Sequence, residues 1–137
     1  MQNKALRLAA WLLIAHFLVV AALSFAAPIS PNYSHLFIKF AFLLGAAHAL
    51  FAPRKRGWVP VVLYLVFILY YQLLGLWTIW SNAAMPRGTK SAMIFFWAVL
   101  NSLPVAALVL IFKPANFAAL KSSPAESPTG EAVGPKA

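Results

Sequence analysis

The chain has 137 residues, of which 63% are hydrophobic and 9% are charged, and its mean hydropathy is +0.81. A soluble domain carries about a quarter charged residues, so this composition excludes an ordinary soluble domain and indicates lipid as the main solvent. Eleven basic residues against two acidic ones give a formal net charge of +9, but they stand at the ends of apolar stretches, which favours membrane topology over nucleic-acid binding.

The first apolar stretch predicts a membrane-spanning helix over residues 6–27. It has about the 20 residues needed to cross ~30 Å of hydrocarbon. A cleaved signal peptide is the alternative, since Ser24-Phe25-Ala26 has the small-x-small form of a cleavage site. The apolar region exceeds the usual length of a signal sequence, so we favour a retained span.

Three further spans follow, over residues 35–52, 58–80 and 91–113. The second and third are separated by a basic turn, Arg54, Lys55 and Arg56, which is the densest run of charge in the chain. Tryptophans stand at both ends of the third span, as interfacial anchoring predicts. Residues 1–114 are expected to form one membrane domain. Residues 115–137 are expected to form a cytoplasmic tail that is largely disordered, because the residues from Lys121 onward include almost no large apolar side chains. At most one interfacial turn is expected before them, over residues 116–120.

The distribution of basic residues predicts that both termini are cytoplasmic. The cytoplasmic set holds eight residues: Lys4, Arg7, Arg54, Lys55, Arg56, Lys113, Lys121 and Lys136. The opposite side holds Lys39, Arg87 and Lys90. Positive charge is retained on the cytoplasmic side, which is the inner face of a bacterial inner membrane. The basic turn is also expected to contact anionic lipid headgroups. Lys39 is expected to extend its amine toward the external headgroups.

The expected fold is all-α: four transmembrane helices in an antiparallel up-down bundle. Helices in lipid associate through small residues and polar contacts, because lipid and leucine are about equally apolar. Helical spacing selects one small-residue stripe on each helix. The predicted packing residues are Ala41, Gly45 and Ala49 in the second span, Gly75 in the third, and Ala98 and Ala106 in the fourth.

A polar layer is predicted near mid-membrane. Five residues fall about 15–20 Å above the cytoplasmic ends of their helices: His16, Tyr71, Gln72, Asn101 and Ser102. Pro104 lies in the same region and is expected to kink the fourth span. His16 is either a structural, neutral histidine that is hydrogen-bonded to Asn101, Gln72 or Tyr71, which we favour, or part of a functional relay.

Enzyme activity, a metal site and a bound cofactor are not expected. Aspartate is absent and both glutamates, Glu126 and Glu131, fall in the tail, so the spans carry no carboxylate base. Haem ligation by His16 and His48 is disfavoured, because their estimated depths differ by about 10 Å. The Pro-Arg-x-Arg turn from Pro53 resembles DoxX-like proteins in layout, but the second span lacks the acidic residue of that family, and membership is not inferred.

Three functions remain open. The first is a non-enzymatic subunit, assembly factor or interaction partner of a membrane complex, acting through its helix surfaces and its basic cytoplasmic edge. The expected partners are the lipid bilayer and either a membrane protein or, for the transporter hypothesis below, further copies of the chain. The second is a small oligomeric transporter or channel with His16, Gln72 and Asn101 as a relay. The third is a protein that binds a quinone or another lipophilic cofactor near Tyr71 and Trp97. No nucleic-acid partner is expected.

Overall fold

The computed structural model describes residues 2–26, 33–54 and 56–121, and this part of the chain is all-helical. Its helices are α1 (Gln2–Ala26), α2 (Tyr33–Phe51), α3 (Trp58–Ser81), α4 (Arg87–Ile111) and α5 (Pro114–Lys121). The first four are long and apolar enough to cross a membrane, as in an integral membrane protein. The predicted spans agree with these four helices to within about one turn at each end.

Prolines mark several of the helix boundaries. Helix α2 ends two residues before Pro53, Pro86 precedes α4, and Pro114 is the first residue of α5. Proline lacks a backbone N–H and is tolerated in the first turn of a helix, where that donor has no intrahelical partner. Pro104 is the exception, since it lies inside α4, which continues unbroken from Arg87 to Ile111.

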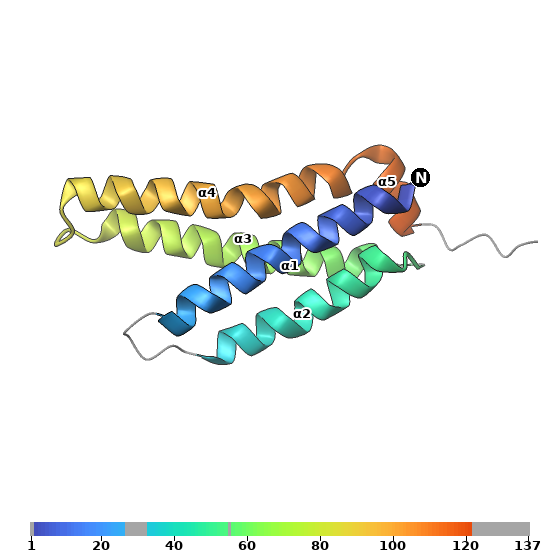
Figure 1. Ribbon diagram of the computed structural model, residues 1–137, viewed down its shortest axis with the longest axis horizontal. Coiled ribbons are helices and arrows are strands. Elements are labelled where there is room, and N and C mark those ends of the chain that lie inside the picture. Colours follow the sequence, from blue (N-terminus) through green and yellow to red (C-terminus); the bar gives the residue numbers. More distant parts are fainter. Residues whose placement is uncertain (1, 27–32, 55, 122–137) are drawn as a thin grey trace, which may run out of the picture.

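Consecutive long helices run in opposite directions and form a four-helix bundle (Figure 1). Helix α1 packs on α4 and α2, and α2 packs on α3, while the α3–α4 pair has the least extensive packing of the four neighbouring pairs. Helices α1 and α3 are diagonal to each other. The described N-terminal residues, the α2–α3 turn and α5 all lie at one end of the bundle, which we call the basic end.

The apolar core is concentrated toward the basic end. The largest fully buried side chains there come from all five described helices: Leu6, Leu13, Leu50, Val61, Tyr64, Ile111 and Leu120. Toward the other end, the α1–α2 pair moves away from the α3–α4 pair (Figure 1). The five helices are therefore held together mainly at one end.

Helix α5 is longer and more buried than the sequence predicted. At most one interfacial turn was expected over residues 116–120, but Pro114–Lys121 form a helix whose Leu120 is fully buried in the core. Asn116 Nδ2 donates a 2.6 Å hydrogen bond to the carbonyl oxygen of Leu110, near the end of α4. Burial of a leucine and satisfaction of a helix-end carbonyl both stabilise the helix, whereas its composition alone gave only a weak signal. Residues 122–137 of the predicted tail lie outside the described part.

The small-residue stripe of α4 faces outward, contrary to the predicted packing. Ala98 and Ala106 are exposed, and so is Ser102 between them, while the face that packs inward holds Asn101, Pro104, Ala107 and Ile111. The stripe was assigned to the interior because small residues favour close helix contact. The polar Asn101 and the bulky Ile111 occupy buried positions of α4 instead.

Helices α2 and α3 meet closely near the basic end, as their small residues predict. Ala49 is buried, and a Cβ placed on Gly45 would lie 3.5 Å from Pro60 Cβ. Ala41, in contrast, is exposed on the outer side of α2. The predicted stripe of α2 is thus inside at its basic end only, where the helices converge.

Candidate functional site

A hydrogen bond between His16 and Gln72 crosses the centre of the bundle. His16 is 3% exposed on α1, and its Nε2 lies 3.2 Å from Nε2 of Gln72 on the diagonal helix α3. The amide nitrogen of Gln72 carries only donors, so it donates and the imidazole nitrogen accepts. This arrangement requires a neutral imidazole with its proton on Nδ1. Two of the five residues of the predicted polar layer are therefore in contact.

Asn101 lies in the same region but bonds within its own helix. Its Nδ2 donates a 2.7 Å hydrogen bond to the carbonyl oxygen of Trp97. Its Oδ1 is buried, and so is the indole Nε1 of Trp97, and neither atom has a hydrogen-bond partner within the described residues. The structure thus leaves one buried acceptor and one buried donor unpaired on the same face of α4.

A narrow groove of about 120 Å³ runs between α3 and α4 and contains these residues. We call it the α3–α4 groove. It is lined by Leu65, Ile68, Leu69, Gln72, Trp97, Asn101, Pro104, Val105 and Leu108. The groove brings together Gln72 and Asn101 of the predicted layer with Trp97, which the sequence suggested as a pocket residue. Its other lining residues are apolar.

Tyr71 belongs to a different cluster, between α3 and α2. Its ring stacks on that of His35 with centroids 5.9 Å apart, and the Lys39 amine lies 4.9 Å from its centroid. The ring also packs against Phe67, with centroids 4.7 Å apart. Tyr71 therefore does not line the α3–α4 groove with Trp97, and the two halves of the predicted cofactor pocket are on different faces of α3.

The Lys39–Tyr71 contact was not anticipated from the sequence. Lys39 was expected to reach headgroups, but in the structure it is half-buried above an aromatic face, where a cation–π interaction partly compensates its removal from water. The sequence did place His35 and Lys39 four residues apart, on one face of the helix, which is the spacing at which both side chains can contact the same neighbouring ring.

The remaining predicted residues lie on the surface of the bundle. Ser102 is exposed and its Oγ donates a 2.6 Å hydrogen bond to the carbonyl oxygen of Val99, so it is separate from the buried layer. Arg54 and Arg56 are exposed in the α2–α3 turn at the basic end. Lys55 lies outside the described residues.

No metal centre is found in the part of the chain that the structure describes, because no group of three or more His, Cys, Asp or Glu side chains could hold an ion. The two histidines weighed as haem ligands also differ in environment. His16 is buried inside the bundle, whereas His48 is exposed on the outside of α2.

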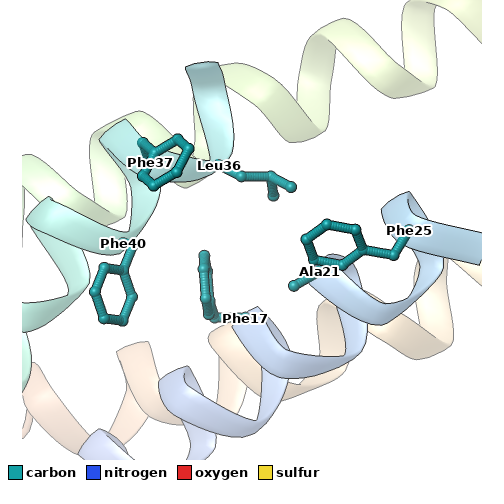
Figure 2. Close-up of a pocket in the computed structure, with 6 residues that line it drawn as sticks. All are labelled: Phe17, Ala21, Phe25, Leu36, Phe37 and Phe40. Atoms are coloured by element: carbon teal, nitrogen blue, oxygen red, sulfur yellow. The ribbon is translucent and has the colours of Figure 1, made fainter. Parts of the chain in front are cut away.

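A larger pocket of about 460 Å³ opens between α1 and α2, away from the basic end. Figure 2 shows its lining side chains, which are Phe17, Ala21 and Phe25 from α1 and Leu36, Phe37 and Phe40 from α2. All six are apolar. An apolar lining is compatible with a lipid acyl chain. These side chains provide no polar group that would fix the orientation of a ligand or select one ligand from others.

Comparison of the chain with protein-family models, with curated proteins and with solved structures finds no match. Conclusions about function therefore depend on the residues and geometry described above.

Proposed function

We propose that the protein is a non-enzymatic, multi-pass protein of the bacterial cytoplasmic membrane that serves as a subunit or assembly partner of a membrane complex. The observation that carries this proposal is the outward orientation of Ala98, Ser102 and Ala106 on α4. These residues recur every four positions and form one small-residue stripe, which we call the α4 stripe.

The α4 stripe is suited to a second transmembrane helix. Small side chains let helix backbones approach closely, and this packing drives association in lipid, where the hydrophobic effect between helices is lost. Ser102 adds no unpaired polar group, because its hydroxyl already donates to Val99. The bundle itself leaves room for a partner, since only 22% to 33% of the most apolar stretch of each long helix is buried.

The basic end supports the proposed location and orientation. Arg54, Arg56, Lys113 and Lys121 are all exposed there, and the described part of the chain holds no acidic residue that would neutralise them. Contact with anionic lipid contributes about 1 kcal/mol per basic residue near the surface. This end is therefore assigned to the cytoplasmic face.

Co-purification from mild detergent tests the proposal. The full chain is expected to retain one partner protein in stoichiometric amount, and Ala98→Leu/Ala106→Leu is expected to lower the retained partner at least about tenfold, a loss of about 1.4 kcal/mol. The control is Ala15→Leu/Ala22→Leu, which adds the same atoms at two exposed positions of α1. Equal retention by both double variants, or recovery of a homodimer without any other protein, would contradict the proposal.

A second candidate, a small oligomeric transporter with a polar relay, is favoured by the His16–Gln72 hydrogen bond. This contact joins two diagonal helices at the bundle centre, and Asn101 follows in the groove beside Gln72. Proton flux into liposomes that depends on His16 would support the relay. Flux that survives His16→Ala unchanged would exclude it.

A further inference from the structure

The α3–α4 groove changes in polarity from its interior to its mouth. Its interior holds Gln72, Trp97 and Asn101, and Asn101 is only 7% exposed. Its mouth holds Leu69, Val105 and Leu108, whose exposed fractions are 58%, 58% and 43%. A molecule in this groove therefore meets polar groups at its inner end and lipid at its outer end.

The interior contains one hydrogen-bond donor and one acceptor that the protein leaves unpaired. Trp97 Nε1 can only donate and Asn101 Oδ1 can only accept, and both atoms are buried. Gln72 lines the same groove and bonds to His16, and neither unpaired atom has a hydrogen-bond partner among the described residues. Hydrocarbon offers no water to pair with such atoms, so leaving them unsatisfied costs several kcal/mol each. A ligand that pairs with both atoms recovers this cost.

The packing of this seam also favours entry of a ligand. The α3–α4 pair is the least extensively packed of the four neighbouring pairs, so parting these two helices disrupts less contact than parting any other. Gly75 keeps a side chain off the indole, since a Cβ built there would be in van der Waals contact with Trp97 Nε1, at 4.0 Å.

The required ligand chemistry follows from the two unpaired atoms. A hydroxyl group accepts a hydrogen bond from Trp97 and donates one to Asn101, whereas a quinone or ketone carbonyl can only accept. A charged head is excluded, because burial of a charge deep in the bilayer is expensive. We propose that the α3–α4 groove binds an uncharged lipophilic alcohol or phenol, with its hydroxyl between Trp97 and Asn101 and its tail leaving past Leu69 and Val105.

The volume agrees with a ligand that inserts only its head. The groove, at about 120 Å³, is well below the roughly 300–1,000 Å³ of a site that encloses a whole drug-sized ligand, so it holds a small head group and not a long chain. The tail then remains in the bilayer beside the exposed leucines and valine of the mouth. This site is separate from the α4 stripe and does not depend on the proposed partner.

The test uses the full chain in lipid nanodiscs with ¹⁵N-labelled tryptophan, and 2-decylhydroquinone as the probe. The chain has five tryptophans, and loss of one indole signal in Trp97→Phe assigns Trp97. We expect the probe to shift the Trp97 indole N–H signal saturably and to leave the exposed Trp77 and Trp80 unshifted. Asn101→Leu is expected to weaken binding about tenfold, with Ser102→Ala as the outward-facing control that leaves it unchanged.

A second comparison needs no variant and so does not depend on folding. The dimethyl ether of the probe keeps the ring and the tail but cannot donate a hydrogen bond, and it is expected to bind the wild-type chain about tenfold more weakly. Equal binding of probe and ether, equal binding by Asn101→Leu and Ser102→Ala, or shifts spread over all indole signals would each overturn the proposal, since the probe would then be partitioning into lipid without a site.

Discussion

At the residue scale, the His16–Gln72 hydrogen bond is unusual because it joins two helices that are diagonal, not adjacent, in the bundle. Helix α1 contacts mainly α4 and α2, while Gln72 is on α3, across the bundle. Because α1 and α3 each pack on both α2 and α4, a bond between α1 and α3 fixes the spacing across the whole bundle. In a bilayer, side-chain hydrogen bonds between helices contribute about 0.6–2 kcal/mol each, because the dissociated helices also find partners.

A double-mutant cycle measures this contribution. His16→Leu and Gln72→Leu are each expected to lower the free energy of unfolding by about 1–2 kcal/mol, because each leaves the other side chain buried without its partner. The double variant is expected to be more stable than the sum of the two losses predicts, by at least about 0.5 kcal/mol. Loss of helicity by circular dichroism during SDS titration provides the readout.

The matched control pairs His16→Leu with Thr78→Ala. Thr78 is exposed on α3 and its hydroxyl donates to the Leu74 carbonyl within the same helix. These two changes should be additive to within about 0.5 kcal/mol. Additive losses for His16 and Gln72 as well would mean that their contact contributes nothing to stability.

Gly57, in the α2–α3 turn, is required by space and not by its own backbone conformation. Its φ of −60° is ordinary, but a Cβ there would lie 3.0 Å from the backbone oxygen of Arg54, and the preceding Arg56 has a φ of 65°. Gly57→Ala is expected to lower the stability by about 1–3 kcal/mol, since the turn must shift to relieve the overlap. Gly88→Ala, with nothing within 4 Å of its added Cβ, is the control in the same SDS titration. An equal response of both variants would show that the turn adapts freely.

At the scale of single helices, α5 closes the basic end of the bundle. Leu120 is fully buried in the core cluster that includes Leu6 and Ile111, and Asn116 bonds to the end of α4. A short helix of eight residues is not stable by itself, so these tertiary contacts hold it in place.

Leu120→Ala is expected to lower the free energy of unfolding by about 2–4 kcal/mol, because it removes a fully buried side chain and leaves a cavity. Leu8→Ala makes the same chemical change at a residue of α1 that is 53% exposed and is expected to cost under about 1 kcal/mol. Thermal unfolding in mild detergent, followed by circular dichroism, compares the two. A loss for Leu120→Ala no larger than that for Leu8→Ala would show that α5 does not pack on the bundle in solution.

The helices themselves were predictable from the sequence, but their rotation about their own axes was not. Four apolar runs of about 20 residues identify the spans, because no other structure satisfies backbone hydrogen bonds in lipid. Lipid and leucine are about equally apolar, so hydropathy does not distinguish the inner face from the outer face. Ala98 and Ala106 were therefore assigned to the interior, while the buried Ala107 was missed.

For the candidate site, the sequence limited the hydrogen-bond partner of His16 to Asn101, Gln72 or Tyr71 but did not choose among them. Gln72 is the partner in the structure, whereas Tyr71 packs toward Lys39 of α2. Residues 71 and 72 are about 100° apart around a helix, so Tyr71 faces the α2–α3 interface while Gln72 lines the α3–α4 groove. The unpaired indole of Trp97 depends on the α3–α4 packing, which no local pattern in the sequence encodes.

At the scale of the whole molecule, the charges divide between the two ends of the bundle. Arg54, Arg56 and Lys113 are exposed at the basic end, whereas Arg87 and Lys90 stand at the start of α4, at the opposite end. Lys90 also donates a 3.0 Å hydrogen bond to the carbonyl oxygen of Trp80, which ties it to the end of α3. The positive-inside rule predicts that the end with more lysine and arginine residues, here the basic end, faces the cytoplasm.

The absence of cysteine from the sequence allows this orientation to be measured directly, with one cysteine added at a time. Ala84 is exposed in the α3–α4 loop, and Ala118 is exposed on α5 at the basic end. Both residues are alanines, so neither substitution removes a charge. A membrane-impermeant maleimide applied to intact bacterial cells is expected to label Ala84→Cys and not Ala118→Cys. After the membrane is permeabilised, both variants should be labelled, because both positions are open to solvent. Labelling of Ala118→Cys alone in intact cells would reverse the orientation and show that Arg87 and Lys90 outweigh the larger basic cluster.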